Sequence, residues 1–361
     1  MILAMDRPWI EAGLKYCAIQ RDDLPCLLVQ RVARLRGTKR LDNGFLRYLI
    51  GSQSFTDHVL AVQTGTAVPH ISSKQIQSYR FELPPLPEQR AIAATLGALD
   101  DKIELNRKMN ATLEAMARAL FRDWFVDFGP TRAKMEGLAP YLSPDLWALF
   151  PDRLDDEGKP EGWEASTIGD EVRVVGGSTP STREPEFWDG TIKWATPKDL
   201  STLSAPVLLE TSRSITAAGL AKISSGLLPV GALLMSSRAP IGYLAIAEVP
   251  VAINQGFIGM ICDKRLSNVL SWLWTLENRE TILAKANGST FQEISKGNFR
   301  PLLVVVPPEP VLHAFHAIAK PLYERIAKNE HESRTLAQTR DLLLPRLISG
   351  QILVQPDAIA G

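Results

Sequence analysis

The chain has 361 residues, of which 45% are hydrophobic and 22% charged, a composition typical of globular proteins and not of disordered or fibrous ones. A length of this order allows about two to three domains. The formal net charge is zero. This balance argues against a free-standing protein that binds nucleic acid by charge alone, although it leaves room for a recognition subunit whose partners supply phosphate contacts.

The N-terminus shows no secretory signal, because Asp6 and Arg7 interrupt its first apolar run. No uninterrupted apolar stretch reaches the roughly 18 residues of a membrane span, and we therefore expect a cytoplasmic protein. The three cysteines, Cys17, Cys26 and Cys262, are widely spaced, which indicates buried reduced thiols and no disulfide framework. The sequence predicts no cofactor and no metal site.

Residues 1–85 form the first predicted globular segment, with short apolar runs between turn residues. Up to Leu83 it has 11 lysines and arginines against 7 aspartates and glutamates. Five of the basic residues cluster in the sequence, at Arg31, Arg34, Arg36, Lys39 and Arg40. Such a cluster is either a solvated face or a patch that follows the phosphates of a nucleic acid, and both interpretations stay open.

Residues 86–126 are predicted to form one long helix. Apolar residues recur there at alternating steps of four and three, which is the a/d seam of a coiled coil. These residues are Ile92, Leu96, Leu99, Ile103, Leu113, Ala117, Leu120 and Trp124. Asn106 and Asn110 occupy the same seam, where a buried asparagine usually fixes register. At about 1.5 Å per residue the helix is roughly 60 Å long, and its seam needs a partner helix.

Residues 127–160 are rich in proline, glycine and aspartate and are predicted to be a linker. A second globular segment, 161–308, follows it. Its predicted elements are strands near 171–176, 192–196, 231–237, 242–248 and 256–261, a helix over 268–286 and an extended run at 301–306. Pro307 and Pro308 close this segment, a second long helix covers 309–350, and 351–361 form a C-terminal tail.

The sequence also contains an internal repeat. A shift of 223 positions places 65–120 on 288–343 without a gap. Identical pairs include Gly65/Gly288, Ile71/Ile294, Ser72/Ser295, Leu99/Leu322, Ile103/Ile326, Asn106/Asn329 and Leu120/Leu343. If the two copies pack about a pseudo-two-fold axis, their helices run antiparallel and the central asparagines, Asn106 and Asn329, meet and satisfy each other. The alternative is two independent surface helices whose asparagines coincide by chance.

Four phrases, in their order and spacing, resemble the specificity subunit of type I restriction-modification systems: LPPLPEQRAIAATLGALDDKIELNRKMN, FRDWFVDFGP, PEGWEASTIGDEV and VAINQGF. The resemblance covers essentially the whole chain. It implies an α+β fold in which two globular α/β target recognition domains are separated by two long helices packed as an antiparallel coiled coil. It also implies that each domain reads one half of a bipartite sequence in double-stranded DNA. The helices would dock two DNA methyltransferase (modification) subunits, and a restriction (translocase/nuclease) subunit would join through the complex.

The first copy departs from this pattern at its start. Residues 1–10 are similar to 233–241, whereas the residues between Glu161 and Leu233 have no counterpart in the first copy. We therefore expect the first recognition domain to lack its N-terminal half. Two functions follow: a specificity subunit that reads a bipartite target, or a truncated scaffold or remnant that does not read DNA and still binds methyltransferase subunits.

Signatures of catalysis are missing from the sequence, which supports a recognition subunit and not an enzyme. There is no phosphate-binding loop, no zinc-protease motif, no nucleophile elbow and no Asp-Pro-Pro-Tyr-like methyltransferase motif. His313 and His316 are close enough in sequence to share a metal, but no further ligands accompany them, so surface residues are the simpler interpretation. Asp155, Glu157 and Lys159 resemble part of a nuclease motif, yet they lie in the predicted linker, where a turn is simpler.

Reading bases in the major groove requires arginine or lysine for guanine and asparagine or glutamine for adenine, on loops or strand ends. In the domain that the resemblance assigns to DNA reading, the candidates are Thr179, Ser181, Arg183, Lys193, Thr196, Lys198, Arg238, Asn254, Gln255, Thr290, Gln292 and Lys296. By the repeat, the corresponding residues of the first copy are Arg7, Gln30, Arg31 and His70. Lys198, Lys222, Lys285 and Lys296 are candidates for phosphate contacts. For any single one of these residues, an ordinary turn is the competing interpretation.

Overall fold

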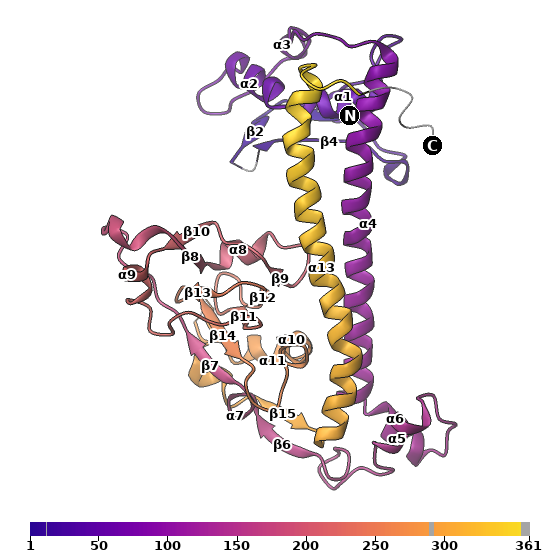
Figure 1. Ribbon diagram of the computed structural model, residues 1–361, viewed down its shortest axis with the longest axis vertical. Coiled ribbons are helices and arrows are strands. Elements are labelled where there is room, and N and C mark those ends of the chain that lie inside the picture. Colours follow the sequence, from indigo (N-terminus) through magenta and orange to yellow (C-terminus); the bar gives the residue numbers. More distant parts are fainter. Residues whose placement is uncertain (12, 289–291, 355–361) are drawn as a thin grey trace. The chain divides into compact units, whose positions relative to one another are not determined.

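The computed structural model of the protein describes residues 1–11, 13–288 and 292–354, which divide into two compact units (Figure 1). The first unit comprises Met1–Leu105 together with Glu332–Gly361, and the second comprises Asn106–His331. Each of the two long helices therefore contributes one half to each unit. The mixture of helix and sheet confirms the predicted α+β class.

The long helices are α4 (Leu86–Phe125) and α13 (Glu309–Ile348), of 40 residues each. In both units their contacts run antiparallel, as Figure 1 shows. In the first unit, Asp100 contacts Arg340 at 2.7 Å and Lys102 contacts Glu332 at 3.2 Å. In the second unit, the rings of Phe121 and Phe315 lie 6.2 Å apart. The predicted pairing of the two helices is therefore present, while supercoiling of the pair stays a prediction.

Three asparagines are buried between the helices, with 0% of Asn106, 3% of Asn110 and 1% of Asn329 exposed. The Asn106 amide donates to the backbone carbonyl of Asn329 at 3.4 Å. The Asn329 amide donates to Oδ1 of Asn110 at 2.8 Å, and the Asn110 amide donates to Glu330 at 2.7 Å. Asn106 and Asn329 thus meet as predicted, but the side-chain partner of Asn329 is the asparagine one turn further along α4.

Within its described residues, the second unit contains two mixed sheets and a separate strand pair. The strand orders are β7-β14-β11-β12-β9, β10-β8-β13 and β15-β6. Their bounds are β6 (Glu164–Thr167), β7 (Arg173–Gly176), β8 (Trp188–Ala195), β9 (Val207–Leu208), β10 (Arg213–Ile215), β11 (Leu233–Ser236), β12 (Leu244–Ala247), β13 (Val251–Ile253), β14 (Phe257–Ile261) and β15 (Leu303–Val306). The five predicted strands and the extended run at 301–306 correspond to β7, β8, β11, β12, β14 and β15. The sequence did not indicate β6, β9, β10 and β13, which are four residues long or shorter.

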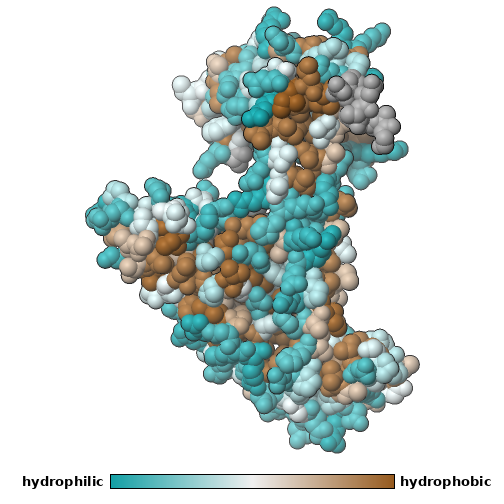
Figure 2. Space-filling view, in the orientation of Figure 1, coloured by the Kyte–Doolittle hydropathy of each residue, from teal (hydrophilic) through white to brown (hydrophobic). Residues whose placement is uncertain are grey.

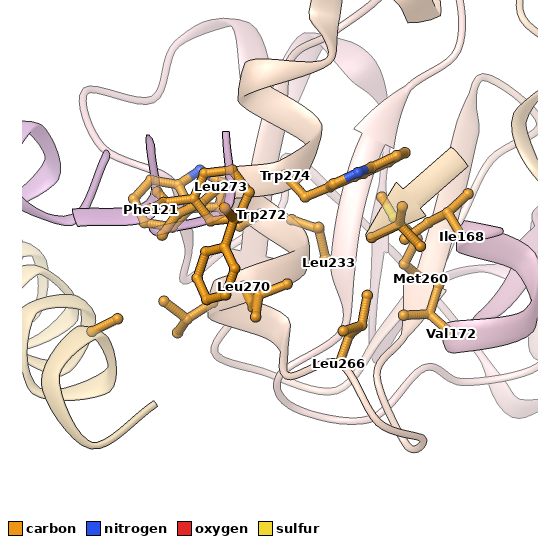
Figure 3. Packing of buried hydrophobic residues seen from close by; sticks show 14 of the residues in the cluster. Phe121, Ile168, Val172, Leu233, Met260, Leu266, Leu270, Trp272, Leu273 and Trp274 are labelled. Atoms are coloured by element: carbon orange, nitrogen blue, oxygen red, sulfur yellow. The ribbon is translucent and has the colours of Figure 1, made fainter. Parts of the chain in front are cut away.

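Helix α10 (Asn268–Glu277) lies between the five-stranded sheet and the long helices, and its buried side chains join the main core (Figures 1 and 3). Trp272 is 1% exposed and packs near the ring of Tyr323 on α13, 6.2 Å between centroids. The predicted helix over 268–286 is interrupted at Asn278, where α11 (Arg279–Ala284) begins. Other helical elements of this unit are short: α7 (Ile168–Glu171), η2 (Pro185–Phe187), α8 (Pro197–Ser201), α9 (Ala217–Leu220) and α12 (Lys296–Phe299).

The stretch 127–160 is more than the linker that its composition indicated. It forms α5 (Gly129–Met135) and α6 (Pro144–Ala148). Phe150 is 2% exposed, and its ring meets that of Trp124 edge-on at 4.9 Å. The prediction missed this because it gave weight to proline and glycine and overlooked the apolar side chains that cover the end of α4.

Within the described residues, the first unit contains a small sheet of order β4-β1-β5, a strand pair, β2-β3, one 3-10 helix and three short α-helices. The bounds are β1 (Ile2–Ala4), β2 (Trp9–Ile10), β3 (Gly13–Leu14), β4 (Tyr16–Cys17), η1 (Arg21–Asp23), β5 (Val32–Arg34), α1 (Asn43–Ile50), α2 (Gln53–Val62) and α3 (Ser73–Gln77). Its core joins Leu3 and Phe45 to Ile92 and Leu96 of α4 and to Leu347 of α13. In Figure 2 apolar residues, in brown, also reach the surface of this unit.

The repeat in the sequence is also a repeat in the structure. β1 and β11 occupy equivalent positions in the two copies, because each pairs with an antiparallel strand on both sides. The N–H of Met5 donates to the carbonyl of Arg31 at 2.8 Å, and the N–H of Ser237 donates to the carbonyl of Gly256 at the same distance. Within the described residues of the first unit, no strand corresponds to β8 or β13.

Two expectations from composition need comment. Cys17 and Cys26 are exposed and Cys262 is half-buried, so the prediction of buried thiols is wrong for the first two. None of the helices in the described parts of the chain is both long enough and apolar enough to cross a membrane. The cytoplasmic location stays a prediction.

Candidate nucleic-acid interface

Five strand ends of the second unit meet at one edge. β11 ends opposite the start of β14, with Ser236 paired to Phe257, and β7 ends beside them at Gly176. The parallel strands β8 and β13 end together at Ala195 and Ile253, and β13 leads directly into β14. The loops that follow these ends, 177–183, 196–198, 237–238 and 254–256, form what we call the strand-end surface.

Backbone and side-chain hydrogen bonds hold these loops together. The N–H of Ser178 donates to the carbonyl of Ile253 at 3.1 Å, and the N–H of Asn254 donates to the carbonyl of Ala195 at 3.1 Å. The hydroxyl of Thr179 donates to the side chain of Gln255. The loops therefore form one connected surface, and fixed loops of this kind hold side chains ready for recognition.

Several predicted residues lie exposed on this surface: Thr179, Ser181, Arg183, Lys198 and Gln255. Arg238 is half-buried and contacts Glu293 at 3.5 Å, which places the neighbouring Gln292 close to it. Lys296 reaches the end of β7, since its Nζ lies 3.0 Å from the position that a Cβ on Gly176 would occupy.

Other predicted residues have local structural roles or lie elsewhere. Lys193 is within β8 and forms an ion pair with Glu210. The Thr196 hydroxyl donates to Asp199 at 2.8 Å in the cap of α8. The side chain of Asn254 accepts from the N–H of Gly256 at 2.9 Å. Thr290 lies outside the described residues.

Of the lysines proposed for phosphate contact, Lys222 and Lys285 are exposed but lie outside the four loops of the strand-end surface. The ammonium group of Lys222 lies 5.6 Å from the centre of the Phe187 ring, and its carbonyl accepts from the Ser178 hydroxyl at 3.1 Å. The carbonyl of Lys285 accepts from the side chain of Asn298 at 3.0 Å, near the start of α12. Lys198 and Lys296 are the two that reach the strand-end surface.

Sequence reasoning missed an aromatic support under the loop 177–183. The indole N–H groups of Trp188 and Trp194 donate to the carbonyls of Ser181 and Ser178, at 3.0 and 3.3 Å. The guanidinium of Arg213 lies 3.5 Å from the centre of the Trp188 ring. The rings of Trp188 and Trp194 lie 5.0 Å apart because the pairing of β8 with β10 is irregular between them, with Ser214 opposite Lys193 and Ile215 opposite Trp188. No pattern in the sequence indicated this irregularity.

In the first unit, three of the four predicted residues come together at the end of β1. Arg31 contacts Asp6 at 3.0 Å, and Asp6 forms a bridge with His70. The N–H of Arg7 donates to the carbonyl of Pro69 at 2.6 Å. Gln30, the fourth, immediately precedes Arg31 and β5. The basic residues Arg34, Arg36, Lys39 and Arg40 are exposed and lie further along the chain.

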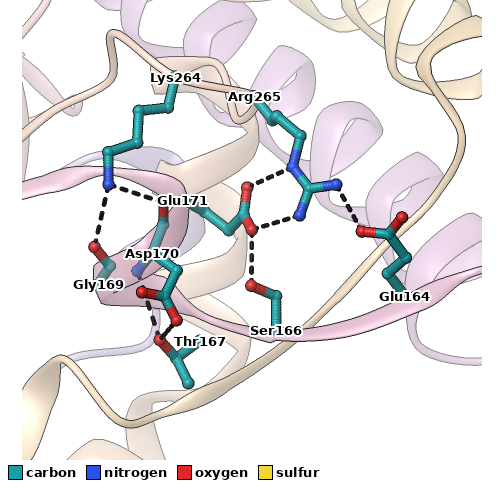
Figure 4. A network of polar contacts seen from close by, with 8 residues as sticks. All are labelled: Glu164, Ser166, Thr167, Gly169, Asp170, Glu171, Lys264 and Arg265. Carbon is teal, nitrogen blue, oxygen red and sulfur yellow. Dashed lines mark hydrogen bonds and ion pairs between the residues drawn. The ribbon is translucent and has the colours of Figure 1, made fainter.

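The opposite edge of the five-stranded sheet is occupied by a charged network (Figure 4). Arg265 donates two hydrogen bonds to the buried Glu171 carboxylate, at 2.6 and 2.9 Å, and a third to Glu164 at 2.7 Å. Burial alone would raise the pKa of Glu171, but the hydrogen bonds from Arg265 and Ser166 outweigh it and the pKa lies below its usual range. This network fixes structure, because its donors and acceptors pair with one another.

The alternative chemical sites from the sequence have simple structural explanations. The Asp155 carboxylate accepts from the backbone N–H groups of Glu157 and Lys159, at 3.0 and 3.1 Å, which is a turn. His313 lies on α13 within 3.5 Å of Glu309, and burial lowers the pKa of His316. Among the residues that the structure describes, no group of three or more His, Cys, Asp or Glu side chains is placed to hold a metal ion.

Comparison with known proteins decides the family. The family model for the type I restriction modification DNA specificity domain matches residues 12–115 and 160–337. The chain belongs to this family. The two matched stretches end within α4 and α13, in agreement with the repeat. Membership confirms the expectation of a DNA-specificity subunit of a type I restriction-modification system, a recognition component and not an enzyme.

Individual relatives agree with this assignment. The specificity subunit of the type I restriction enzyme HindI from Haemophilus influenzae is 26% identical over 355 residues, which cover 85% of this chain and 77% of that protein. The MjaIX specificity subunit from Methanocaldococcus jannaschii is 26% identical over 317 residues, covering 86% and 69%. Among solved structures, the type I restriction-modification S subunit from M. genitalium is 18% identical with a TM-score of 0.49, covering 85% of this chain and 73% of that one. A structural likeness this low does not bear on function.

Proposed function

We propose that the second unit reads one half of a bipartite DNA target through its strand-end surface, and that the first unit reads the other half at the end of β1. The observation behind this proposal is the shared pattern of the two copies, in which Arg31 and Gly256 accept the same backbone hydrogen bond beside their candidate residues. Equivalent strand ends in two copies suit a DNA target with two parts. On this view the protein acts in the cytoplasm, where the chromosome is accessible.

The residue types on the strand-end surface suit base reading in the major groove. Arg183 is exposed and suits a guanine, whereas Gln255 suits an adenine and is oriented by Thr179. Lys198 and Lys296 suit phosphate oxygens, which position the protein without specifying sequence. We therefore assign sequence discrimination to Arg183 and Gln255 and positioning to the two lysines, because only base contacts discriminate between sequences.

The long helices would dock two methyltransferase subunits, and the restriction subunit would join through that complex. Apolar side chains outside the seam support this part of the proposal. On α4, 53% of Leu105 and 53% of Met116 are exposed, and on α13, 57% of Leu342 is exposed. Leu105 and Leu342 belong to the first unit and Met116 to the second, so each unit exposes an apolar side chain of a long helix to which a partner can pack.

The test uses the full chain in complex with its cognate methyltransferase subunits, and maps methylated positions across a bacterial genome. We expect one bipartite motif. Arg183→Ala should relax one base of one half-site, at about 1–3 kcal/mol of lost discrimination. The matched control is Arg173→Ala, which removes an exposed arginine at the opposite end of β7 and should leave the motif unchanged. An unchanged motif in the Arg183 variant would contradict its assignment.

A second candidate is a scaffold that binds methyltransferase subunits without reading DNA. The observation that favours it is the small sheet of the first unit, which within the described residues has three main strands where the second unit has five. A complex that assembles normally but methylates no defined sequence would support the scaffold and exclude the reader.

A further inference from the structure

The guanidinium of Arg213 lies in a corner between two tryptophan rings of the second unit. Its central carbon is 3.5 Å from the centre of the Trp188 ring and 5.5 Å from the centre of the Trp194 ring. The two rings meet at 85°, with 5.0 Å between their centroids, and both tryptophans are buried whereas Arg213 is exposed. A tryptophan face attracts a cation placed over it, so the rings hold the guanidinium in place.

The backbone of Arg213 is fixed as well. β10 begins at Arg213, which pairs with Trp194, one residue before the end of β8. The Thr211 hydroxyl donates to the carbonyl of Arg213 at 2.7 Å. The N–H of Ser212 donates to the Asp199 carboxylate of α8 at 2.7 Å. Arg213 therefore lies at the edge of the strand-end surface, beside α8.

The guanidinium N–H groups of Arg213 have no acceptor among the residues that the structure describes. The carboxylates nearest to it along the chain contacts are occupied. Both oxygens of Asp199 accept backbone hydrogen bonds, and Glu210 forms an ion pair with Lys193. By contrast, Arg265 at the opposite edge donates three hydrogen bonds to carboxylates. Arg213 is thus held by ring contacts while its donors are available to a ligand.

The chemistry of a stacked arginine suits a guanine. The N–H donors of a guanidinium form a planar fork that matches O6 and N7 of guanine in the major groove. Stacking on Trp188 uses the face of this fork and leaves its edge available. The same tryptophan holds the loop 177–183, because its N–H donates to the carbonyl of Ser181 at 3.0 Å. One ring therefore orients Arg213 and also supports the loop that presents Arg183.

We propose that Arg213 is a specificity-determining residue that reads a guanine in the half-site of the second unit, and that Trp188 is its positioning residue. This inference rests on the proposed function and adds a base contact to it. A fixed orientation matters for a base contact, which discriminates by direction, and less for a phosphate contact, which requires only charge and reach.

The test is Arg213→Lys in the full chain, in complex with its cognate methyltransferase subunits. Initial methylation rates are compared between a duplex that carries the wild-type motif and duplexes with single base changes. Lysine keeps the positive charge over Trp188 but lacks the planar fork. We expect discrimination at one base pair of one half-site to fall about 5- to 150-fold, with the other half-site unchanged. The matched control, Arg173→Lys, changes an exposed arginine bound to Asp263 and should leave discrimination unchanged at every position.

A second variant tests the positioning role. Trp188→Leu removes the ring beneath Arg213 and should relax the same base pair as Arg213→Lys. The double variant should lose no more discrimination at that base pair than Arg213→Lys alone, because the tryptophan acts there through the arginine. Urea unfolding records any loss of stability separately, and a merely structural role of Trp188 would lower stability without selecting one base pair.

Three results would overturn the proposal. The first is unchanged discrimination in Arg213→Lys, and a relaxed base pair in Arg183→Ala would then show that the proposed function holds without this residue. The second is an equal loss of methylation on every duplex in Arg213→Ala, with a salt dependence reduced by about one phosphate contact, which would make Arg213 a phosphate contact. The third is a wild-type complex that methylates no defined sequence, which would overturn the proposed function as well.

Discussion

Replacing Asn329 with alanine tests whether the buried asparagines hold the long helices in register. The substitution removes the donor to Oδ1 of Asn110 at 2.8 Å, in a position where 3% of Asn110 is exposed and water does not replace the lost partner. A buried polar group that loses its partner costs about 1–3 kcal/mol. We expect Asn329→Ala to lower the free energy of unfolding by about that amount.

The assay is urea unfolding followed by tryptophan fluorescence, since Trp124 and Trp272 are both buried in the core that includes the start of α13. The single variants Asn110→Ala and Asn329→Ala and the double variant form a cycle, in which contacting residues show a coupling of about 0.5–3 kcal/mol. Replacing both residues with leucine should keep or raise stability, because no polar group is left unpaired, while loosening the register of the helices. A coupling energy of zero would refute the reasoning.

Three further predictions concern other parts of the molecule. Because the pKa of Glu171 is lowered in the folded state, its contribution to stability is present above about pH 4.3, the usual glutamate pKa, and is lost as the pH falls through the folded pKa. Glu171→Gln should therefore lower the free energy of unfolding at pH 7 and weaken its fall at acid pH. An unaltered fall at acid pH would argue against the network with Arg265. Burial raises the pKa of the Cys262 thiol to about 11. At pH 8 Cys262 should therefore be alkylated far more slowly than the exposed Cys17 and Cys26. Equal alkylation rates would contradict the burial of Cys262. Inserting four residues beside Asn106, with a matched insertion beside Asn329, adds roughly 6 Å of helix. The insertion should widen the gap between the two half-sites by more than one base pair. An unchanged gap in the methylated motif would exclude a spacer role for the helices.

Much of the architecture was predictable because its signals are local. Apolar seams, together with Pro307 and Pro308 before the second helix, were sufficient to predict the extents of α4 and α13 to within two residues. The strand runs of the second unit were recognisable because short clusters of three or more apolar residues adjoin turn residues. The linker prediction failed because it counted proline and glycine only. The burial of Phe150 depends on its ring contact with Trp124, which is distant from it in the sequence.

The candidate site was predictable as a set of residue types and not as a surface. Arg183, Gln255 and Lys198 were selected from three separate loops, and only strand pairing shows that these loops share an edge. Side-chain contacts give two other candidates local roles, since Lys193 forms an ion pair with Glu210 and Thr196, although it lies in one of these loops, caps α8. Arg213 was missed because its stacking on Trp188 joins residues that no local pattern connects.

The sequence by itself determined the repeat, the length and spacing of the two helices, and the family, because each depends on residue order and periodicity along one chain. Only the tertiary structure decided that Asn329 bonds to Asn110 and that five strand ends meet at one edge. The physical reason is the same in each case. Hydrogen bonds and burial between distant segments depend on which surfaces come together, and residue periodicity along the chain does not specify that pairing.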